Sequence, residues 1–202
     1  IMTCAPITVA TRFVTIASRA RVTGAGNVSI SQSVAYVACM SLTPTATEMR
    51  ARARSDLRLG LPIVLTGAAR AMLCVAVEAL DDTRLAALRA EGVPELALTA
   101  RRAETLKARA YDGDLARIAI PAEADCRWLM AVADPADDLR VPLKGPLTSL
   151  REGAADLHRA AIALAKSAEL LPAVVMVPVA EGLALAARHG LTLLAAPDCV
   201  DL

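Results

Sequence analysis

The feature that most constrains the fold is the uncharged run Ala173–Val179, which reads AVVMVPV. Seven apolar residues, most of them β-branched, suit a strand that is buried on both faces. Val175 and Val177 would face one side of such a strand, and Val174 and Met176 the other, so helices are expected to cover both sides.

The segments on either side of this run have helical patterns. Residues 157–171 repeat apolar side chains at helical spacing, and residues 181–190 end in Gly190, a residue typical of helix C-termini. Residues 191–195 form a further predicted strand. The order helix, buried strand, helix, strand indicates an α/β unit.

Earlier parts of the chain add more elements of both kinds. Thr45 and Glu48 have the spacing of a capping box, which predicts a helix that ends at Gly60. Asp82 is predicted to cap a further helix that Gly92 closes. The other predicted elements are strands at 62–66, 71–77, 95–99 and 116–120, helices at 101–109 and 126–133, and a proline-containing loop at 134–147.

Composition narrows the function classes. The 202 residues are 55% hydrophobic but only 2% aromatic, so Ala, Leu and Val must build the core. A net charge of +1 argues against a nucleic-acid partner or an anionic membrane surface, and no apolar run approaches the ~18 residues of a spanning helix. The cysteines are single, with no CxxC pair, which argues against a zinc ribbon or a disulfide framework and favours a cytoplasmic setting: Cys4, Cys39, Cys74, Cys126 and Cys199.

Residues 1–39 differ from the rest, because they contain no Asp or Glu and carry Arg12, Arg19 and Arg21. Two interpretations follow: an organellar leader, or upstream sequence translated ahead of a true start at Met40. We favour the second, and expect residues 1–39 to be poorly ordered and residues 40–202 to form one α/β domain.

Three short segments carry a family resemblance. ADP at residues 133–135, VPLKG at 141–145 and ARHGLTLL at 187–194 stand in an order and spacing similar to those of 3,4-dihydroxy-2-butanone 4-phosphate synthase, an enzyme of riboflavin biosynthesis. The resemblance covers roughly residues 54–202. It implies an α/β (α+β) fold with a mixed sheet of about five to seven strands covered by helices.

The catalytic residues that the resemblance implies are missing. The family has an Asp-Arg-Glu-Asn-Glu-Gly loop whose carboxylates hold magnesium and take protons from ribulose 5-phosphate, whereas residues 66–72 here read TGAARAM. The family's ligand histidine falls on Leu157, its strand-end glutamate on Pro178 and its cysteine on Val177. His158 is one residue away from the histidine position, about 100° around a helix. We therefore expect no catalytic residue, no magnesium site and no synthase activity.

The resemblance also suggests a role for such a domain. Some members of the family are fused ahead of GTP cyclohydrolase II and have lost their catalytic residues. We expect this chain to be a degenerate domain of that kind, a fragment with a structural or dimerisation role and neither activity. Its expected partners are a second copy in a homodimer and a cyclohydrolase domain in the same polypeptide. Any zinc would belong to that further domain, because thiolate ligands close together in sequence are not found here.

Basic residues remain as candidates for binding an anion, although solvated charge is the default interpretation of each: Arg101, Arg102, Lys107, Lys144, His158 and Arg159. Two alternatives stay open. The chain could be a free-standing regulatory module that binds a phosphorylated metabolite, or a small α/β enzyme of another family. Polar side chains converging in a pocket would favour the enzyme.

Overall fold

The structure is a computed structural model that describes residues 43–199, apart from the side chains of Asp137 and Asp198. The interpretation of residues 1–39 lies outside the described residues. Within residues 43–199, no helix is long and apolar enough to cross a membrane.

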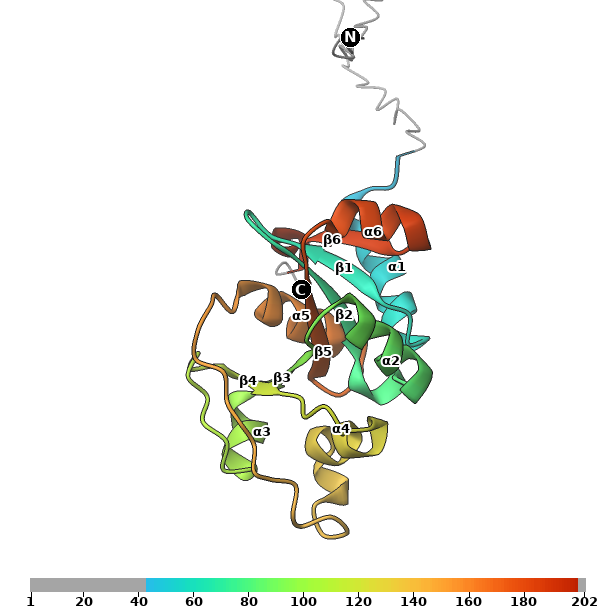
Figure 1. Cartoon of the computed structure of the whole chain (residues 1–202). Helices are drawn as coiled ribbons and strands as arrows, with labels where there is room; N and C mark the ends of the chain where they lie inside the picture. The colour runs from blue at the N-terminus through green and yellow to red at the C-terminus, as the bar shows by residue number, and fades with distance from the viewer. Residues whose placement is uncertain (1–42, 200–202) are drawn as a thin grey trace, which may run out of the picture. The chain divides into compact units, whose positions relative to one another are not determined.

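Helices and strands alternate along most of the described chain (Figure 1). The helices are α1 (Ala46–Arg58), α2 (Asp82–Glu91), α3 (Ala100–Thr105), α4 (Cys126–Ala133), α5 (Asp156–Ser167) and α6 (Gly182–His189). The strands are β1 (Ile63–Thr66), β2 (Ala71–Ala76), β3 (Glu95–Thr99), β4 (Leu115–Ala119), β5 (Ala173–Val179) and β6 (Thr192–Ala195). Short 3-10 helices are η1 (Val77–Ala79), η2 (Pro135–Asp137) and η3 (Ala196–Cys199).

The strands form one mixed sheet in the order β4-β3-β5-β2-β1-β6. Strands β1 and β6 run parallel, and every other neighbouring pair is antiparallel. The expected α/β fold with a mixed sheet of five to seven strands is therefore confirmed. Strand β5 lies in the interior of the sheet, where it joins the β1–β2 pair to the β3–β4 pair.

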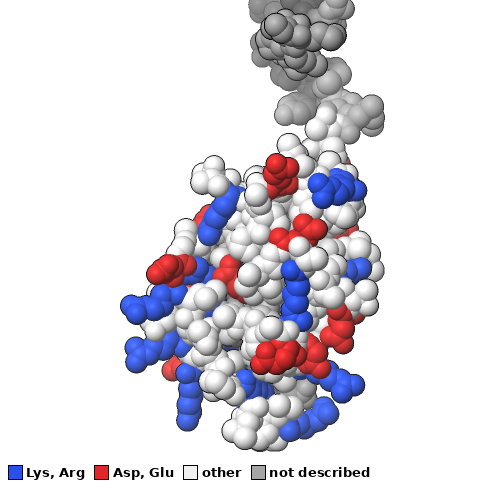
Figure 2. Space-filling model, in the orientation of Figure 1, with Lys and Arg blue, Asp and Glu red and all other residues white. Residues whose placement is uncertain are grey.

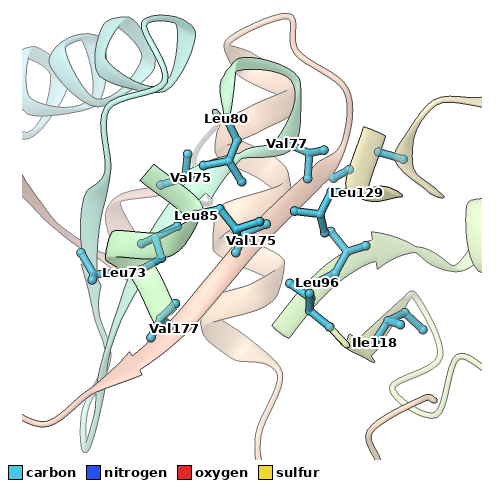
Figure 3. Packing of buried hydrophobic residues seen from close by; sticks show 14 of the residues in the cluster. Leu73, Val75, Val77, Leu80, Leu85, Leu96, Ile118, Leu129, Val175 and Val177 are labelled. Carbon is cyan, nitrogen blue, oxygen red and sulfur yellow. The ribbon is translucent and has the colours of Figure 1, made fainter. Parts of the chain in front are cut away.

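Side chains of β5 alternate between two hydrophobic cores. Val175 and Val177 belong to one core, together with Leu85 of α2, Leu129 of α4 and Leu185 of α6. Figure 3 shows several of these side chains converging on Val175. Because successive residues of a strand point to opposite faces, both cores share this one strand.

The second core lies on the opposite face of the sheet. Val174 and Met176 of β5 pack there with Leu57 of α1 and with Leu157 and Leu164 of α5. The predicted burial on both faces is thus confirmed for residues 173–177, with helices on each side, whereas Pro178 is exposed and Val179 is partly exposed at the end of the strand.

Most predicted elements are present with small shifts at their ends. The capping box of α1 is confirmed: the amide of Glu48 donates to Oγ1 of Thr45, and the amide of Thr45 donates to Oε2 of Glu48. The cap predicted at Asp82 was wrong by one residue. Asp81 caps α2, and Asp82 is its first helical residue, whose carboxylate accepts a hydrogen bond from the amide of Cys126 at 2.9 Å.

Two predicted helices end earlier than their apolar patterns suggested. Helix α3 stops at Thr105 instead of residue 109, and α5 stops at Ser167 instead of residue 171. Lys107 and Glu169 have φ angles of 57° and 59°, left-handed values that a right-handed helix cannot continue through.

Candidate functional site

The turn between β1 and β2 is fixed against the start of α5. A guanidinium nitrogen of Arg70, Nη2, donates to the carbonyl of Ala154 and to the carboxylate of Asp156. A Cβ placed on Gly67 would lie 3.3 Å from Oδ2 of Asp156, so the turn passes very close to this helix. Partial burial is the largest single influence on Asp156 and raises its pKa, but the bonds from Arg70 and the backbone outweigh it and lower the pKa.

A second polar pair lies next to this turn, between β3 and α5. His158 is completely buried, and its Nε2 lies 3.2 Å from Oε1 of Glu95, whose side chain is 13% exposed. The two groups are close enough to form an ion pair, yet they are not aligned as a hydrogen bond. Within the described residues, neither ring nitrogen of His158 has a hydrogen-bond partner. A fully buried polar ring without partners is unusual, because burial of polar atoms is costly when no hydrogen bond replaces water.

Glu95 lines a pocket of about 360 Å³ at this end of the sheet. Arg70 from the β1–β2 turn, Met72 from β2, and Pro178 and Val179 from β5 line the same pocket. The pocket therefore joins one carboxylate and one guanidinium across apolar walls. Chemically, such an arrangement can accept hydrogen bonds at Glu95 and bind an anion at Arg70.

Segments that the sequence analysis compared with catalytic segments meet around this pocket. The β1–β2 turn and Pro178 line it, and the turn also lies against Leu157, whose side chain is 3.4 Å from a Cβ placed on Gly67. Leu157 is fully buried in a hydrophobic core. Sequence positions far apart are thus close together in space.

Residues at these positions do not fit a magnesium ion. Magnesium binds oxygen ligands, and Leu157 and Pro178 have none in their side chains. The turn residues 66–70 contribute Arg70 as their only charged group. Across residues 43–199, no three His, Cys, Asp or Glu side chains are grouped in a way that could hold a metal ion.

Two of the basic residues considered for anion binding, Arg102 and Lys144, share a carboxylate. Nη1 and Nη2 of Arg102 each donate to Asp138 at 2.7 Å, and Nζ of Lys144 also donates to Asp138. Arg102 donates further to the carbonyls of Val132, Ala131 and Asp134 at the end of α4. The bonds from Arg102 and Lys144 hold the pKa of Asp138 well below its usual range. Arg102 and Lys144 are both buried, and their bonds to Asp138 hold the loop that follows α4.

The remaining basic candidates lie apart from this pair. Nε and Nη2 of Arg159 donate to the carboxylate of Asp114 at 2.9 to 3.0 Å, at a site where both side chains are about half exposed. Arg101 is exposed beside a shallow pocket of α3, and Lys107 lies near Lys144 in another pocket. The structure therefore pairs Arg102 with Lys144 and does not gather all the candidates into one site. Their binding of an anion stays a prediction.

Two further residues, Glu95 and Arg117, matter here and were not among the predicted site residues. Glu95 begins β3 and showed no motif, although a carboxylate in an otherwise apolar strand was a usable signal. Arg117 lies in β4, where it is 3% exposed and binds Asp112 and the carbonyls of Glu152 and Gly153. An arginine inside a buried strand of pattern LARIA was a comparable signal.

Charged side chains form no single continuous patch on the face seen in Figure 2, where Lys and Arg alternate with Asp and Glu. Glu95 and Arg70 are distinguished from these surface charges by the pocket that both of them line.

Comparison with known proteins gives a fold and no family. No family model matches the sequence, and no curated protein matches it. Among solved structures, the chain is similar to a 3,4-dihydroxy-2-butanone 4-phosphate synthase in its cation-free form, with a TM-score of 0.56 and 17% identity over 74% of this chain and 94% of that chain.

Two further structures agree. A synthase of the same name in complex with two magnesium ions has a TM-score of 0.54 and 16% identity, over 74% of this chain and 94% of that chain. RibBX, a two-domain 3,4-dihydroxy-2-butanone 4-phosphate synthase from A. baumannii, has a TM-score of 0.52 and 18% identity, over 77% of this chain and 56% of that chain. The described residues thus have the fold of these synthases.

Proposed function

We propose that this chain is a non-catalytic, synthase-like domain that belongs to a GTP cyclohydrolase II polypeptide of riboflavin biosynthesis. In this proposal its role is structural: it helps the polypeptide to fold, forms a homodimer or positions the partner domain. One observation carries the proposal. At the positions that would hold catalytic groups, an acid-free turn and Pro178 line one pocket, and Leu157 lies against that turn.

Loss of the synthase reaction follows from the chemistry of that reaction. Enolisation needs a carboxylate that is positioned against the substrate, and magnesium needs oxygen ligands around it. Glu95 is a carboxylate in the pocket, but its Oε1 lies 3.2 Å from Nε2 of the buried His158. No oxygen-rich set of ligands surrounds it among the described residues.

The activity test is release of formate from ribulose 5-phosphate at several magnesium concentrations. We expect none above the buffer control, alongside a synthase that releases formate under the same conditions. Formate release that disappears in the His158→Ala variant would overturn the proposal, since it would mean that α5 supplies a working histidine.

The proposed dimer has a candidate surface in the loop after η2. Leu139 and Leu143 are 96% and 90% exposed there, which is unusual for leucines so close together in sequence. We propose that a second copy of the chain covers them. Light scattering coupled to size exclusion should report a dimer, and the double variant Leu139→Ser, Leu143→Ser should report a monomer. Leu183→Ser, at a leucine that is 70% exposed on α6, is the matched control and should stay dimeric.

The proposed link to a cyclohydrolase is tested in the encoding DNA. Cyclohydrolase chemistry uses a zinc-activated water held by closely spaced cysteines. A Cys-x2-Gly-x7-Cys-x-Cys pattern should be encoded within roughly one domain length of the codon for Leu202. The absence of this pattern from intact flanking sequence would remove the link.

The proposed setting is cytoplasmic. Free thiols at Cys74 and Cys126 support a reducing compartment of this kind.

One observation favours a second candidate, a module that binds a small metabolite. Two side chains of opposite charge, Glu95 and Arg70, line the pocket beside the β1–β2 turn, and Nε2 of the buried His158 lies 3.2 Å from Oε1 of Glu95. Arg70 holds the turn through Nη2, and its part-exposed side chain leaves its other nitrogens open to a ligand.

A further inference from the structure

Two charged side chains line the pocket beside the β1–β2 turn, and the carboxylate of Glu95 is less exposed than the guanidinium of Arg70. Glu95 is 13% exposed and lines the pocket, and the one close polar contact of its carboxylate within residues 43–199 joins Oε1 to Nε2 of His158 at 3.2 Å. A carboxylate that is mostly removed from water normally accepts several hydrogen bonds. Oε2 of Glu95 therefore has unused acceptor capacity in a residue that lines the pocket.

His158 contacts only one of the two carboxylate oxygens of Glu95. Its Nε2 lies 3.2 Å from Oε1, and neither ring nitrogen is aligned for a hydrogen bond among the described residues. Oε2 of Glu95 has no such contact within residues 43–199. A cationic group in the pocket can therefore pair with Oε2.

Arg70 supplies the opposite charge at the outer side of the pocket. Its Nη2 is engaged by Ala154 and Asp156, while its Nε and Nη1 have no hydrogen-bond partner among the described residues. Its side chain is 33% exposed, so these nitrogens can reach a ligand from solvent. Met72, Pro178 and Val179 form apolar walls of the same pocket.

We propose that this pocket binds a small zwitterion of the amino-acid type, whose ammonium group pairs with Glu95 and whose carboxylate pairs with Arg70. A volume of about 360 Å³ is at the small end of ligand pockets, which suits a molecule of this size. The short aliphatic part of the ligand contacts Met72 and Pro178. This inference names the ligand of the second candidate function and rests on it.

The test titrates the protein with glycine, 4-aminobutyrate and 6-aminohexanoate, which separate the two charges by increasing lengths, and follows binding by NMR and thermal shift. Butyrate and butylamine, which carry one charge each, are the control ligands. We expect at least one zwitterion to bind, and each single-charge control to bind at least about tenfold more weakly.

Variants connect the binding to the pocket. Glu95→Gln and Arg70→Gln should each weaken binding of the zwitterion at least about tenfold. Glu169→Gln and Arg127→Gln, at exposed positions away from the pocket, should leave it unchanged. Circular dichroism checks that each variant is folded. If Glu95→Gln is unstable, Arg70→Gln still tests the pocket, because the side chain of Arg70 is partly exposed.

Three results would overturn the inference: no zwitterion binding at about 50 mM, binding that survives Glu95→Gln in a folded protein, or tighter binding of ribulose 5-phosphate or zinc in the same pocket. None of these results bears on the structural role, which the dimer and formate measurements test separately.

Discussion

Strand β5 and the segment of residues 134–153 lie in one domain and are held by different interactions. Hydrocarbon covers β5 on both faces, since residues 173–177 are at most 1% exposed. Residues 134–153 contain little regular structure, and cations of neighbouring elements hold them: Arg102 through Asp138 and Arg117 through the carbonyls of Glu152 and Gly153.

A basic residue can therefore be an internal anchor in this chain. Arg102 and Lys144 were candidates for binding an external anion, but both bind an internal carboxylate, Asp138. A cation that fixes a loop and a cation that binds a ligand look alike in the sequence until the partner is located. If the two regions depend on different forces, substitutions in them should have effects of different size.

The largest effect is expected from a charge placed in β5. Val175→Asp should lower the free energy of unfolding by at least about 4 kcal/mol, because the new carboxylate would be buried without a partner. Chemical denaturation or the loss of soluble, folded protein measures it. Met176→Asp should behave alike on the other face. Leu183→Asp, at an exposed position of α6, is the control and should stay folded. A folded Val175→Asp protein would show that helices do not cover that face of β5.

A smaller but clear effect is expected from the main anchor of residues 134–153. Arg102→Ala should cost about 3 kcal/mol, because buried carbonyls at the end of α4 lose their donor. Hydrogen exchange should also become faster in residues 134–147. Arg101→Ala, at the exposed neighbouring position, should change the stability very little. Equal effects of the two variants would contradict the distinction between anchoring and solvated cations.

Acid should weaken the interactions that hold residues 134–153 before it weakens the packing of β5. The pKa of Asp138 is lowered by Arg102 and Lys144, so the stability that this carboxylate contributes is complete above its unfolded pKa and is lost as the pH falls toward the lowered folded value. The stability difference between wild type and Asp138→Asn should therefore be constant from pH 8 to about pH 5 and shrink below about pH 4. A difference that grows on acidification would have the wrong sign.

The smallest effect is expected at an exposed ion pair. Arg159→Gln removes the bonds to Asp114, but both side chains are about half exposed, so the unfolding free energy should change by less than about 0.5 kcal/mol. Thermal unfolding at low and high salt measures this. A loss as large as that of Arg102→Ala would place Arg159 among the anchors.

More of the fold than of the site could be predicted from the sequence, for a physical reason. The two faces of β5 and the cap at Thr45 depend on residues close together in sequence, so their spacing was informative. The partners of Arg102 lie 29 to 36 residues away, and Glu95 meets His158 only because β3 pairs with β5 beneath α5. No local pattern encodes such contacts. The strand order of the sheet was also not predictable, since β5 pairs with β2 and β3 across long connections.

That strand order has a kinetic consequence. The β1–β2 and β3–β4 pairs can each close over a short stretch of chain, but they do not pair with each other; β5 must insert between them. Until it does, each pair presents an open hydrogen-bonding edge, and loop-closure entropy delays its covering. We expect refolding to protect the amides of residues 63–76 and 95–119 before those of β5, in pulse-labelling hydrogen exchange. Until β5 is inserted, two chains can associate incorrectly through these unpaired strand edges. The refolding yield should therefore fall as the protein concentration rises.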